Sequence, residues 1–169
     1  MARAVTDIRI RAATLDDAGL LLQLIRELAA YERAPDAVIA TEDDLRRHGF
    51  GSERRFEALI ALIEDEPAGF ALFYPDFSTW EGRPGLFLED LYVRDWARHR
   101  GVGRRLMARL AAIAVQRDWP GIHFNVLDWN PARAFYQRLG IEPRAEWRPY
   151  ATGGEALRRL AAQDICETD

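Results

Sequence analysis

The stretch from Leu86 to Leu106 limits the possible folds of this chain more than any other part of the sequence. It begins with an apolar run that ends at Val93 and predicts a buried strand. A turn follows with Gly101 and Gly103, where backbone can approach a ligand without interference from a Cβ atom. The helix that comes next begins with N–H groups that have no internal partner and with partial positive charge. The sequence therefore predicts an anion-binding site at this connection.

Arginines surround the predicted site and supply permanent charge in a fork geometry that suits phosphate oxygens. They are Arg98, Arg100, Arg104 and Arg105. Two known phosphate-binding loops do not fit this turn. A P-loop requires a lysine, and the chain has none; the dinucleotide fingerprint requires a third glycine where Leu106 stands. The alternative is a glycine turn that only caps a surface helix.

Length and composition predict one globular domain that covers residues 1–169. The chain has 169 residues, of which 49% are apolar and 30% charged, so it can bury a sizeable core and has no composition typical of disorder. Its net charge of -4 gives no general attraction to nucleic acid or to an anionic membrane. We therefore expect neither as a partner, while a cationic small molecule suits the charge.

The rarer residue types exclude several chemistries. The absence of lysine excludes Schiff-base catalysis. The histidines, His48, His99 and His123, are scattered, and Cys166 is the only cysteine, so we expect neither a metal site nor an internal disulfide. Residues 1–10 lack the apolar core of a signal peptide, and no apolar run approaches the ~20 residues of a membrane span. The expected location is the cytoplasm.

The first half of the chain predicts two strands in a hairpin, preceded by a strand and two helices. Alternation predicts the first strand, and Thr14 with Asp17 approximates a capping box at the start of the first helix. The predicted elements are a strand at 7–12, helices at 14–31 and 41–49, and hairpin strands at 56–63 and 68–77 around the connection Asp65–Pro67.

The second half predicts helices that alternate with strands. Asn130 and Pro131 are typical of a helix N-terminus, and Gly140 is typical of the position after a helix end. The predicted elements are the strand 86–93, the helix 101–118, a strand at 122–127, a short helix to residue 139, a last strand at 143–150 and a final helix at 152–162. This order predicts an α/β (α+β) fold whose central mixed sheet is mostly antiparallel and flanked by helices.

Glu89 and Asp90 interrupt the predicted strand 86–93, where an ionised carboxylate without a partner is costly. Because neighbouring residues of a strand point to opposite faces, we expect the two acids to have different roles, one toward a ligand and one toward the backbone or core. The alternative is that both are satisfied by nearby amides at an irregularity of the sheet.

Several other side chains are candidates for chemistry. Tyr136 is suited to protonate a departing thiolate, or else it is a core or interface tyrosine. His123 is a candidate for the site or else a satisfied histidine of the core or rim. Aromatic faces and carboxylates that suit an organic cation are offered by Tyr31, Glu32, Trp80 and Trp147.

The pattern Arg98-x-x-Gly101-x-Gly103 resembles the acetyl-CoA pyrophosphate loop of the GNAT N-acetyltransferase superfamily. Other segments in the same order as in that superfamily are Leu88–Val93, His123–Phe124, Trp129–Asn130 and Phe135–Gly140. Together with Ile10–Thr14, Glu27–Glu32 and Thr41–Leu45, they make nearly the whole chain similar to the spermidine/spermine and thialysine N-acetyltransferases.

The resemblance implies a GNAT fold and a set of roles. Glu89, directly or through water, would take the proton from the attacking ammonium, and Tyr136 would protonate the CoA thiolate. The coenzyme would be held by Leu91, Tyr92 and Val93 at the pantetheine arm, by Arg98, His99, Arg100, Gly101, Val102, Gly103 and Arg104 at the pyrophosphate, and by Asn130. The acceptor would lie near Tyr31, Glu32, Trp80, Glu89, Asp90, His123, Phe124, Glu146 and Trp147.

The function that the resemblance implies is transfer of acetyl from acetyl-CoA to the primary amine of a small cationic acceptor, such as a diamine, polyamine or thialysine-like lysine analogue. Transfer would be direct, in a ternary complex, and the enzyme would be a homodimer. The alternatives are a protein or peptide N-acetyltransferase and a non-catalytic module that binds acyl-CoA.

The chain departs from those enzymes at three places. His99 stands where many of them have glycine, and the segment between Asn130 and Tyr136 is one residue shorter. Ser78 and Thr79 stand where they tend to have an acid, which favours a shorter amine over a true polyamine.

Overall fold

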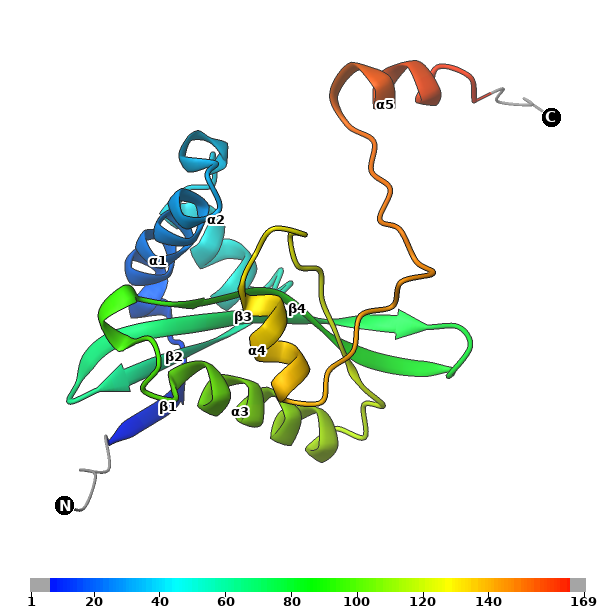
Figure 1. Ribbon diagram of the computed structural model, residues 1–169. Coiled ribbons are helices and arrows are strands. Elements are labelled where there is room, and N and C mark those ends of the chain that lie inside the picture. Colours follow the sequence, from blue (N-terminus) through cyan, green and yellow to red (C-terminus); the bar gives the residue numbers. More distant parts are fainter. Residues whose placement is uncertain (1–6, 165–169) are drawn as a thin grey trace. The chain divides into compact units, whose positions relative to one another are not determined.

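A computed structural model of the protein describes residues 7–164 (Figure 1). The chain divides into two compact units, one that ends at Leu127 and one that begins at Asp128. Each unit is described by itself.

The first unit contains a sheet whose strands follow one another in sequence order, β1-β2-β3-β4-β5. The first four strands pair with one another in antiparallel fashion, and β5 is parallel to β4. The strands are β1 (Ile8–Ala12), β2 (Glu57–Ile63), β3 (Glu66–Ser78), β4 (Arg83–Val93) and β5 (Ile122–His123). This arrangement confirms the predicted mixed, mostly antiparallel sheet.

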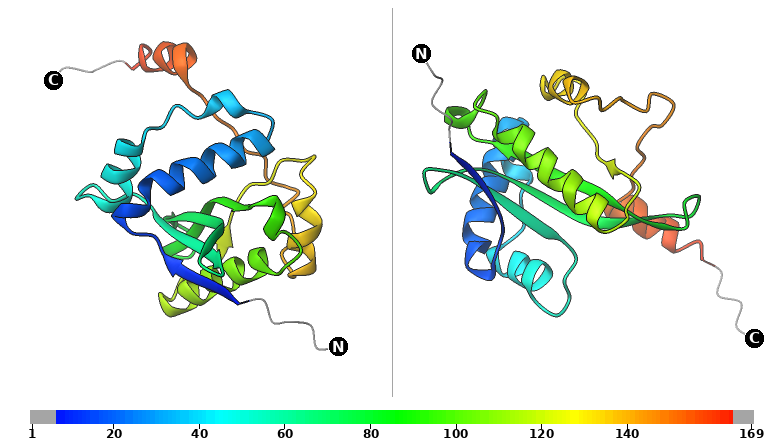
Figure 2. Two further views of the ribbon diagram at one scale, coloured as in Figure 1. Left: turned by 90° about the vertical axis from the view of Figure 1, so that its left-hand side faces the viewer. Right: turned by 90° about the horizontal axis from the view of Figure 1, so that it is seen from below.

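Helices lie on both faces of this sheet, as Figure 2 shows. The α-helices of this unit are α1 (Ala18–Tyr31), α2 (Glu42–Leu45) and α3 (Val102–Gln116), and the other helical turns are η1 (Leu15–Asp17), η2 (Pro35–Ala37), η3 (Arg46–Phe50) and η4 (Asp95–Ala97). Leucines of α1 pack with Ile60, Phe70 and Leu72 of the sheet in one buried cluster. The buried residues of α3 include Leu106 and Leu110.

The predicted capping residues, Thr14 and Asp17, stabilise η1, the turn that leads directly into α1. The Asp17 carboxylate accepts hydrogen bonds from the Thr14 N–H at 2.7 Å and the Thr14 hydroxyl at 3.0 Å. It also accepts two from the Arg11 guanidinium, at 2.7 and 2.8 Å. These bonds hold the pKa of Asp17 at about 2, chiefly through Arg11. The same charge therefore joins β1 to the helix that covers the sheet.

The connection between β2 and β3 differs from the prediction. Ile63 pairs with Glu66, so the turn consists of Glu64 and Asp65 rather than Asp65–Pro67. Both turn residues have positive φ, 50° and 66°, as a tight two-residue hairpin requires. Pro67 instead lies within β3, next to a register shift in its pairing with β2.

The second unit contains α4 (Ala132–Arg138) and α5 (Gly154–Ala161). Gly140 has a φ of 78° just after α4, as predicted. The predicted strand 143–150 was wrong, because these residues are exposed and form neither strand nor helix. Pro143 and Pro149 supply no N–H for a strand ladder.

In the first unit, the fifth strand was also shorter than predicted, since it ends at His123. No helix within residues 7–164 is long and apolar enough to cross a membrane.

Candidate active site

A bulge in β4 determines where the two acids of the apolar strand point. Leu72 of β3 pairs with Asp90, but Phe73 pairs with Leu88, so Glu89 is an extra residue in the ladder. A bulge of this kind interrupts the strict alternation of side chains. The sequence offered no sign of it beyond the two acids themselves.

The bulge places both carboxylates on the face of the sheet that α1 covers. Asp90 lies opposite Leu72, a member of the α1 core cluster, and directly opposed residues share a face. Glu89 accepts a hydrogen bond at 3.2 Å from the hydroxyl of Tyr74, two residues beyond Leu72 on the same face. The expectation that the acids face opposite sides was therefore wrong, because the bulge removes the alternation on which it rested.

Burial changes the acidity of this face. Desolvation, together with the charges of Glu89 and Glu32, raises the pKa of Asp90 to about 7. Burial also raises the pKa of Glu32, the residue directly after α1. Desolvation and the neighbouring carboxylates of Glu89 and Asp76 raise the pKa of the Tyr74 phenol. Burial on this face thus favours the neutral forms of Asp90 and Glu32, and a nearby cation would favour the charged forms.

Two residues of this face were missed at the level of sequence. Tyr74 stacks on Phe87 with ring centroids 5.1 Å apart, and Asp76 lies 3.1 Å from the Nδ1 atom of His123. Both lie at the end of the run 68–77, which was predicted only as a hairpin strand. The signal that predicts them is alternation, since Tyr74 and Asp76 are separated by Pro75 and followed by Phe77.

Past the acids, β4 has an open edge. The parallel pairing with β5 is limited to Leu86 with Ile122 and Phe87 with His123. Residues 91–93 at the end of β4 are paired with β3 but with no second strand among residues 7–164. Their outward backbone groups are therefore positioned to pair with an extended ligand that carries amides.

The glycine turn follows this edge and begins α3. Gly101 has a φ of 96° and forms the N-cap of the helix, so a residue with a Cβ atom there would be strained. His99 also has a positive φ, of 60°. In the first turn of α3, the N–H groups of Val102, Gly103 and Arg104 have no partner inside the helix, as at any helix N-terminus. The turn thus has the backbone geometry on which the predicted anion site depends, and the site itself stays a prediction.

Arg98 organises this turn. Its Nε atom donates to the Val93 carbonyl at 3.1 Å, and its guanidinium lies 2.7 Å from Asp95. The guanidinium also lies over the ring of Tyr31, 4.6 Å from the centroid. The structure thus brings Tyr31, predicted near the acceptor, against the first arginine of the turn.

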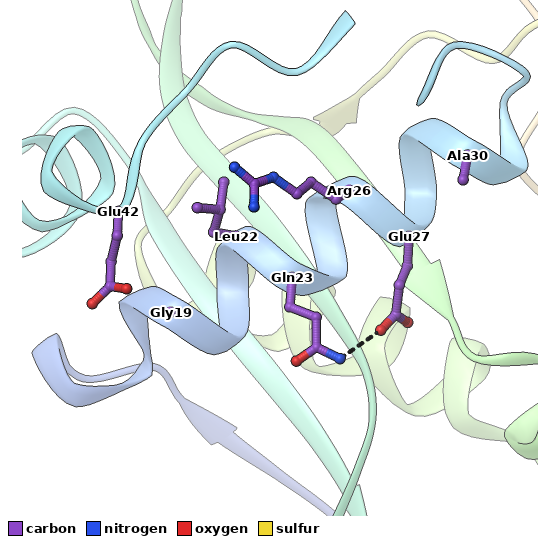
Figure 3. A pocket seen from close by; sticks show the side chains of 7 residues that line it. All are labelled: Gly19, Leu22, Gln23, Arg26, Glu27, Ala30 and Glu42. Carbon is purple, nitrogen blue, oxygen red and sulfur yellow. Dashed lines mark hydrogen bonds between the residues drawn. The ribbon is translucent and has the colours of Figure 1, made fainter. Parts of the chain in front are cut away.

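An ion pair fixes the other side of the β4 terminus. Two nitrogens of Arg94 donate to Glu27 of α1 at 2.9 and 2.7 Å, and a third donates to the Pro67 carbonyl. Glu27 also accepts from Gln23, as Figure 3 shows. Gln23 and Glu27 also border an open hollow of about 540 Å³ along α1, whose other lining residues are Gly19, Leu22, Arg26, Ala30 and Glu42. None of the predicted site residues lines this hollow.

The other predicted residues lie apart from these contacts or in the second unit. Trp80 is 89% exposed in the turn between β3 and β4. In the second unit the Asn130 side chain accepts from the Ala132 N–H at 2.9 Å and so caps α4. Tyr136 is buried within α4, whereas Glu146 and Trp147 are exposed. No cluster of three or more metal-ligating side chains occurs in the described part of the chain.

An open strand edge that leads into a helix N-terminus, beside a face rich in carboxylates, is an arrangement suited to a phosphorylated, amide-containing donor and a cationic acceptor, as in a transferase. Residues 21–141 match the model of the acetyltransferase (GNAT) family. The chain belongs to this family and is an N-acetyltransferase, and the family uses acetyl-CoA.

Known relatives agree with this assignment. The chain is 36% identical to a thialysine N-epsilon-acetyltransferase of Bos taurus, over 92% of this chain and 98% of that protein. It is 34% identical to a human spermidine/spermine N(1)-acetyltransferase-like protein 1, over 92% of this chain and 24% of that protein. Among solved structures, an integron cassette protein from the mobile metagenome of V. cholerae superposes with a TM-score of 0.77, at 26% identity over 91% of this chain and 97% of that one.

Proposed function

We propose that this N-acetyltransferase transfers acetyl from acetyl-CoA to the primary amine of a small cationic acceptor, directly and within a ternary complex. We propose also that both units belong to one catalytic domain. The observation that carries the proposal is the face on which Glu32, Asp76, Glu89 and Asp90 gather beside the open edge of β4. Such a face attracts a cation and holds it next to the place where a donor would lie.

The donor side of the proposal uses backbone more than side chains. The pantetheine arm would pair with residues 91–93 at the open edge of β4, and the diphosphate would accept hydrogen bonds from the first turn of α3. Arg98 supports both, since it binds the Val93 carbonyl and stands at the start of the turn. In the second unit, we propose that Asn130 contacts the coenzyme. Binding of both substrates in line would supply much of the rate enhancement.

The remaining proposed roles are those of the residues that transfer protons. An alkyl ammonium with a pKa near ~10 must lose a proton before it attacks the thioester. We propose that Glu89 accepts this proton, directly or through water, because its carboxylate lies on the acceptor face and is held by Tyr74. Asp90 would assist as a neighbour that retains a proton near pH 7. Tyr136 would then protonate the departing thiolate.

The acceptor class is supported by the charge of this face and by the relatives. One relative is named for thialysine, and another resembles the spermidine/spermine enzymes by name. Both kinds of acceptor are small amines with a second ammonium. His123, Phe124 and the exposed Trp80, Glu146 and Trp147 remain proposed contacts of the acceptor.

The decisive experiment is release of free CoA thiol by the purified protein, with each of several amines added to acetyl-CoA. The panel contains diamines, polyamines, lysine analogues and a lysine-containing peptide, and mass spectrometry identifies the product. Thiol release that requires an added small amine supports the proposal. Binding of acetyl-CoA without amine-dependent release would favour the non-catalytic module, and activity confined to the peptide would favour a protein acetyltransferase.

Tyr136→Phe tests the proposed acid. Since general acid catalysis contributes about 10²-fold or more, we expect kcat to fall by about that factor while the Kd for acetyl-CoA changes little. Kinetics with a saturating amine and calorimetry with CoA measure the two quantities. A variant as active as the parent would reassign Tyr136 to packing.

The proposal includes a homodimer, which the family resemblance suggests. Light scattering on the purified chain tests it, and a monomeric mass at working concentration would contradict it.

A further inference from the structure

We propose that Asp76, oriented by His123, binds a second ammonium group of the acceptor and so determines which amines the enzyme prefers. This inference rests on the proposed function and specifies the substrate class of the same site. It assigns a role to a residue outside the set predicted from sequence.

Asp76 lies on the same face of the sheet as the proposed proton acceptor. Asp76 lies on β3 two residues after Tyr74, and side chains two apart on a strand share a face. Tyr74 in turn binds Glu89 at 3.2 Å. Glu89, Tyr74 and Asp76 therefore form a row along one face of the sheet, with the proposed proton acceptor at one end and Asp76 at the other.

The two carboxylate oxygens of Asp76 have different surroundings. A carboxylate only accepts hydrogen bonds, so the Nδ1 atom of His123 is the donor in their 3.1 Å contact. That bond involves Oδ2, whereas Oδ1 is buried and has no hydrogen-bond partner among the described residues. The side chain as a whole is still 32% exposed. Because Oδ1 is buried, this exposed area belongs to the other atoms of the side chain, so an ammonium would approach at Oδ2. A carboxylate oxygen has more than one lone pair, so Oδ2 can accept from an ammonium as well as from His123.

Gly85 makes room for this arrangement. It lies directly opposite Asp76 in the antiparallel pair, and a Cβ atom built on it would be 2.7 Å from the Asp76 Oδ1 atom. The φ of Gly85 is not positive, so the backbone itself does not require glycine there. The absence of a side chain therefore serves the carboxylate across the strand.

The spacing indicates which acceptors fit. Four residues of β4 separate Gly85 from Glu89, which is about 13 Å of extended strand, slightly less with the bulge. An acceptor whose reacting nitrogen lies at Glu89 would reach Asp76 only if its second ammonium is several methylenes away. The aromatic rings of Tyr74 and Phe87, stacked between the two ends, would cover that aliphatic chain. Ser78, where related enzymes tend to have an acid, is the next residue on this face.

The test compares amines that differ only in the second ammonium. Cadaverine is compared with pentylamine, and lysine with 6-aminohexanoate, so that diamines and diamino acids are separate arms. We expect the parent enzyme to prefer the dicationic member of at least one pair. In Asp76→Asn, kcat/KM for that member should fall about 10- to 100-fold, as expected when one charged hydrogen bond is lost, with little change for the monoamine.

Matched variants separate a contact from a general effect. Asp65→Asn makes the same change of charge in the turn before β3, far from Asp76 along the strand, and should leave the preference intact. Gly85→Ala should weaken the preference without any change of charge, and should have no further effect in the Asp76→Asn background. His123→Ala should raise KM for the dicationic amine at unchanged kcat, and His123→Gln, which can still donate a hydrogen bond, should restore much of it.

The outcomes are distinct. Dependence on Asp76 in the diamine arm, the diamino acid arm or both supports the inference and identifies the source of the ammonium. An equal loss for mono- and dicationic amines, or no loss, overturns it while the proposed function stands. A parent enzyme that uses both members of each pair equally also overturns it. If no amine accepts acetyl, the proposed function fails, and this inference fails with it.

Discussion

The two ends of the candidate site on β4 are built in opposite ways. The donor end is one continuous segment, from Val93 through the glycine turn into α3, and its parts are backbone groups and arginines. The acceptor face is assembled from α1, β3, β4 and β5, and its parts are carboxylates, a phenol and a histidine. A contiguous site is visible as a sequence pattern, whereas a site assembled from four elements depends on register.

Their electrostatics differ as well. At the donor end the acids are paired, as in Glu27 with Arg94 and Asp95 with Arg98. At the acceptor end Asp90 faces Glu89 and Glu32, and burial raises its pKa to about 7. The acids of the donor end are therefore balanced by neighbouring arginines, while at the acceptor end carboxylates lie beside one another. Three substitutions break or sharpen this contrast.

Glu89→Gln should have the largest effect, because it removes the proposed proton acceptor from the acceptor face. We expect kcat/KM for the amine to fall by about 10²- to 10⁴-fold and its pH profile to shift, with the Kd for acetyl-CoA unchanged. Steady-state kinetics over pH and calorimetry measure these quantities. Glu64→Gln, in the β2–β3 turn, is the matched control. An unchanged profile would remove Glu89 from the mechanism.

Asp90→Asn should come next, with an effect on stability. The folded-state pKa of Asp90 lies above its ordinary value of 3.8. Between about pH 4 and pH 7, the folded protein therefore keeps a proton on Asp90 that the unfolded chain has already lost. Stability of the parent should therefore fall as pH rises through this window. The variant should lack that slope and be more stable at pH 8 by on the order of 2 kcal/mol. Urea unfolding at pH 5 and pH 8 measures it, and parallel slopes would contradict the assignment.

Glu27→Gln should have the smallest effect and the opposite dependence on pH. The hydrogen bonds from Arg94 lower the pKa of Glu27, so the stability that they provide is present above pH 4.5 and is lost as pH falls below it. The variant should lose about 1–2 kcal/mol at pH 7 and less in acid. Glu155→Gln is the control, since its pair with Arg159 in α5 is exposed and should contribute little. Equal losses in both variants would contradict the role given to Arg94.

Local signals in the sequence predicted much of the fold. Thr14 with Asp17, Gly101 and Gly140 all occupy the helix-terminal positions that their chemistry favours, because caps depend on residues near in sequence. The prediction of a last strand at 143–150 was wrong for a related reason. Apolar residues between Pro143 and Tyr150 predict a strand, but a strand needs a partner and a complete ladder of N–H groups.

The acceptor face was less predictable. Glu89 and Asp90 were recognised as unusual, yet their common direction depends on a bulge that the sequence does not mark. Asp76 was overlooked because its importance arises from His123, 47 residues away, and from Gly85 across the hairpin. Pairings of this kind are set by strand register, which single-sequence patterns specify poorly.

The short β5 has a further consequence for the coenzyme. Unpaired strand edges attract other chains and are usually protected in native proteins. An acetyl-CoA molecule that lays its pantetheine amides along residues 91–93 would act as a sixth strand and would shield that edge. Saturation with the donor would then protect the enzyme against self-association as well as prepare it for catalysis.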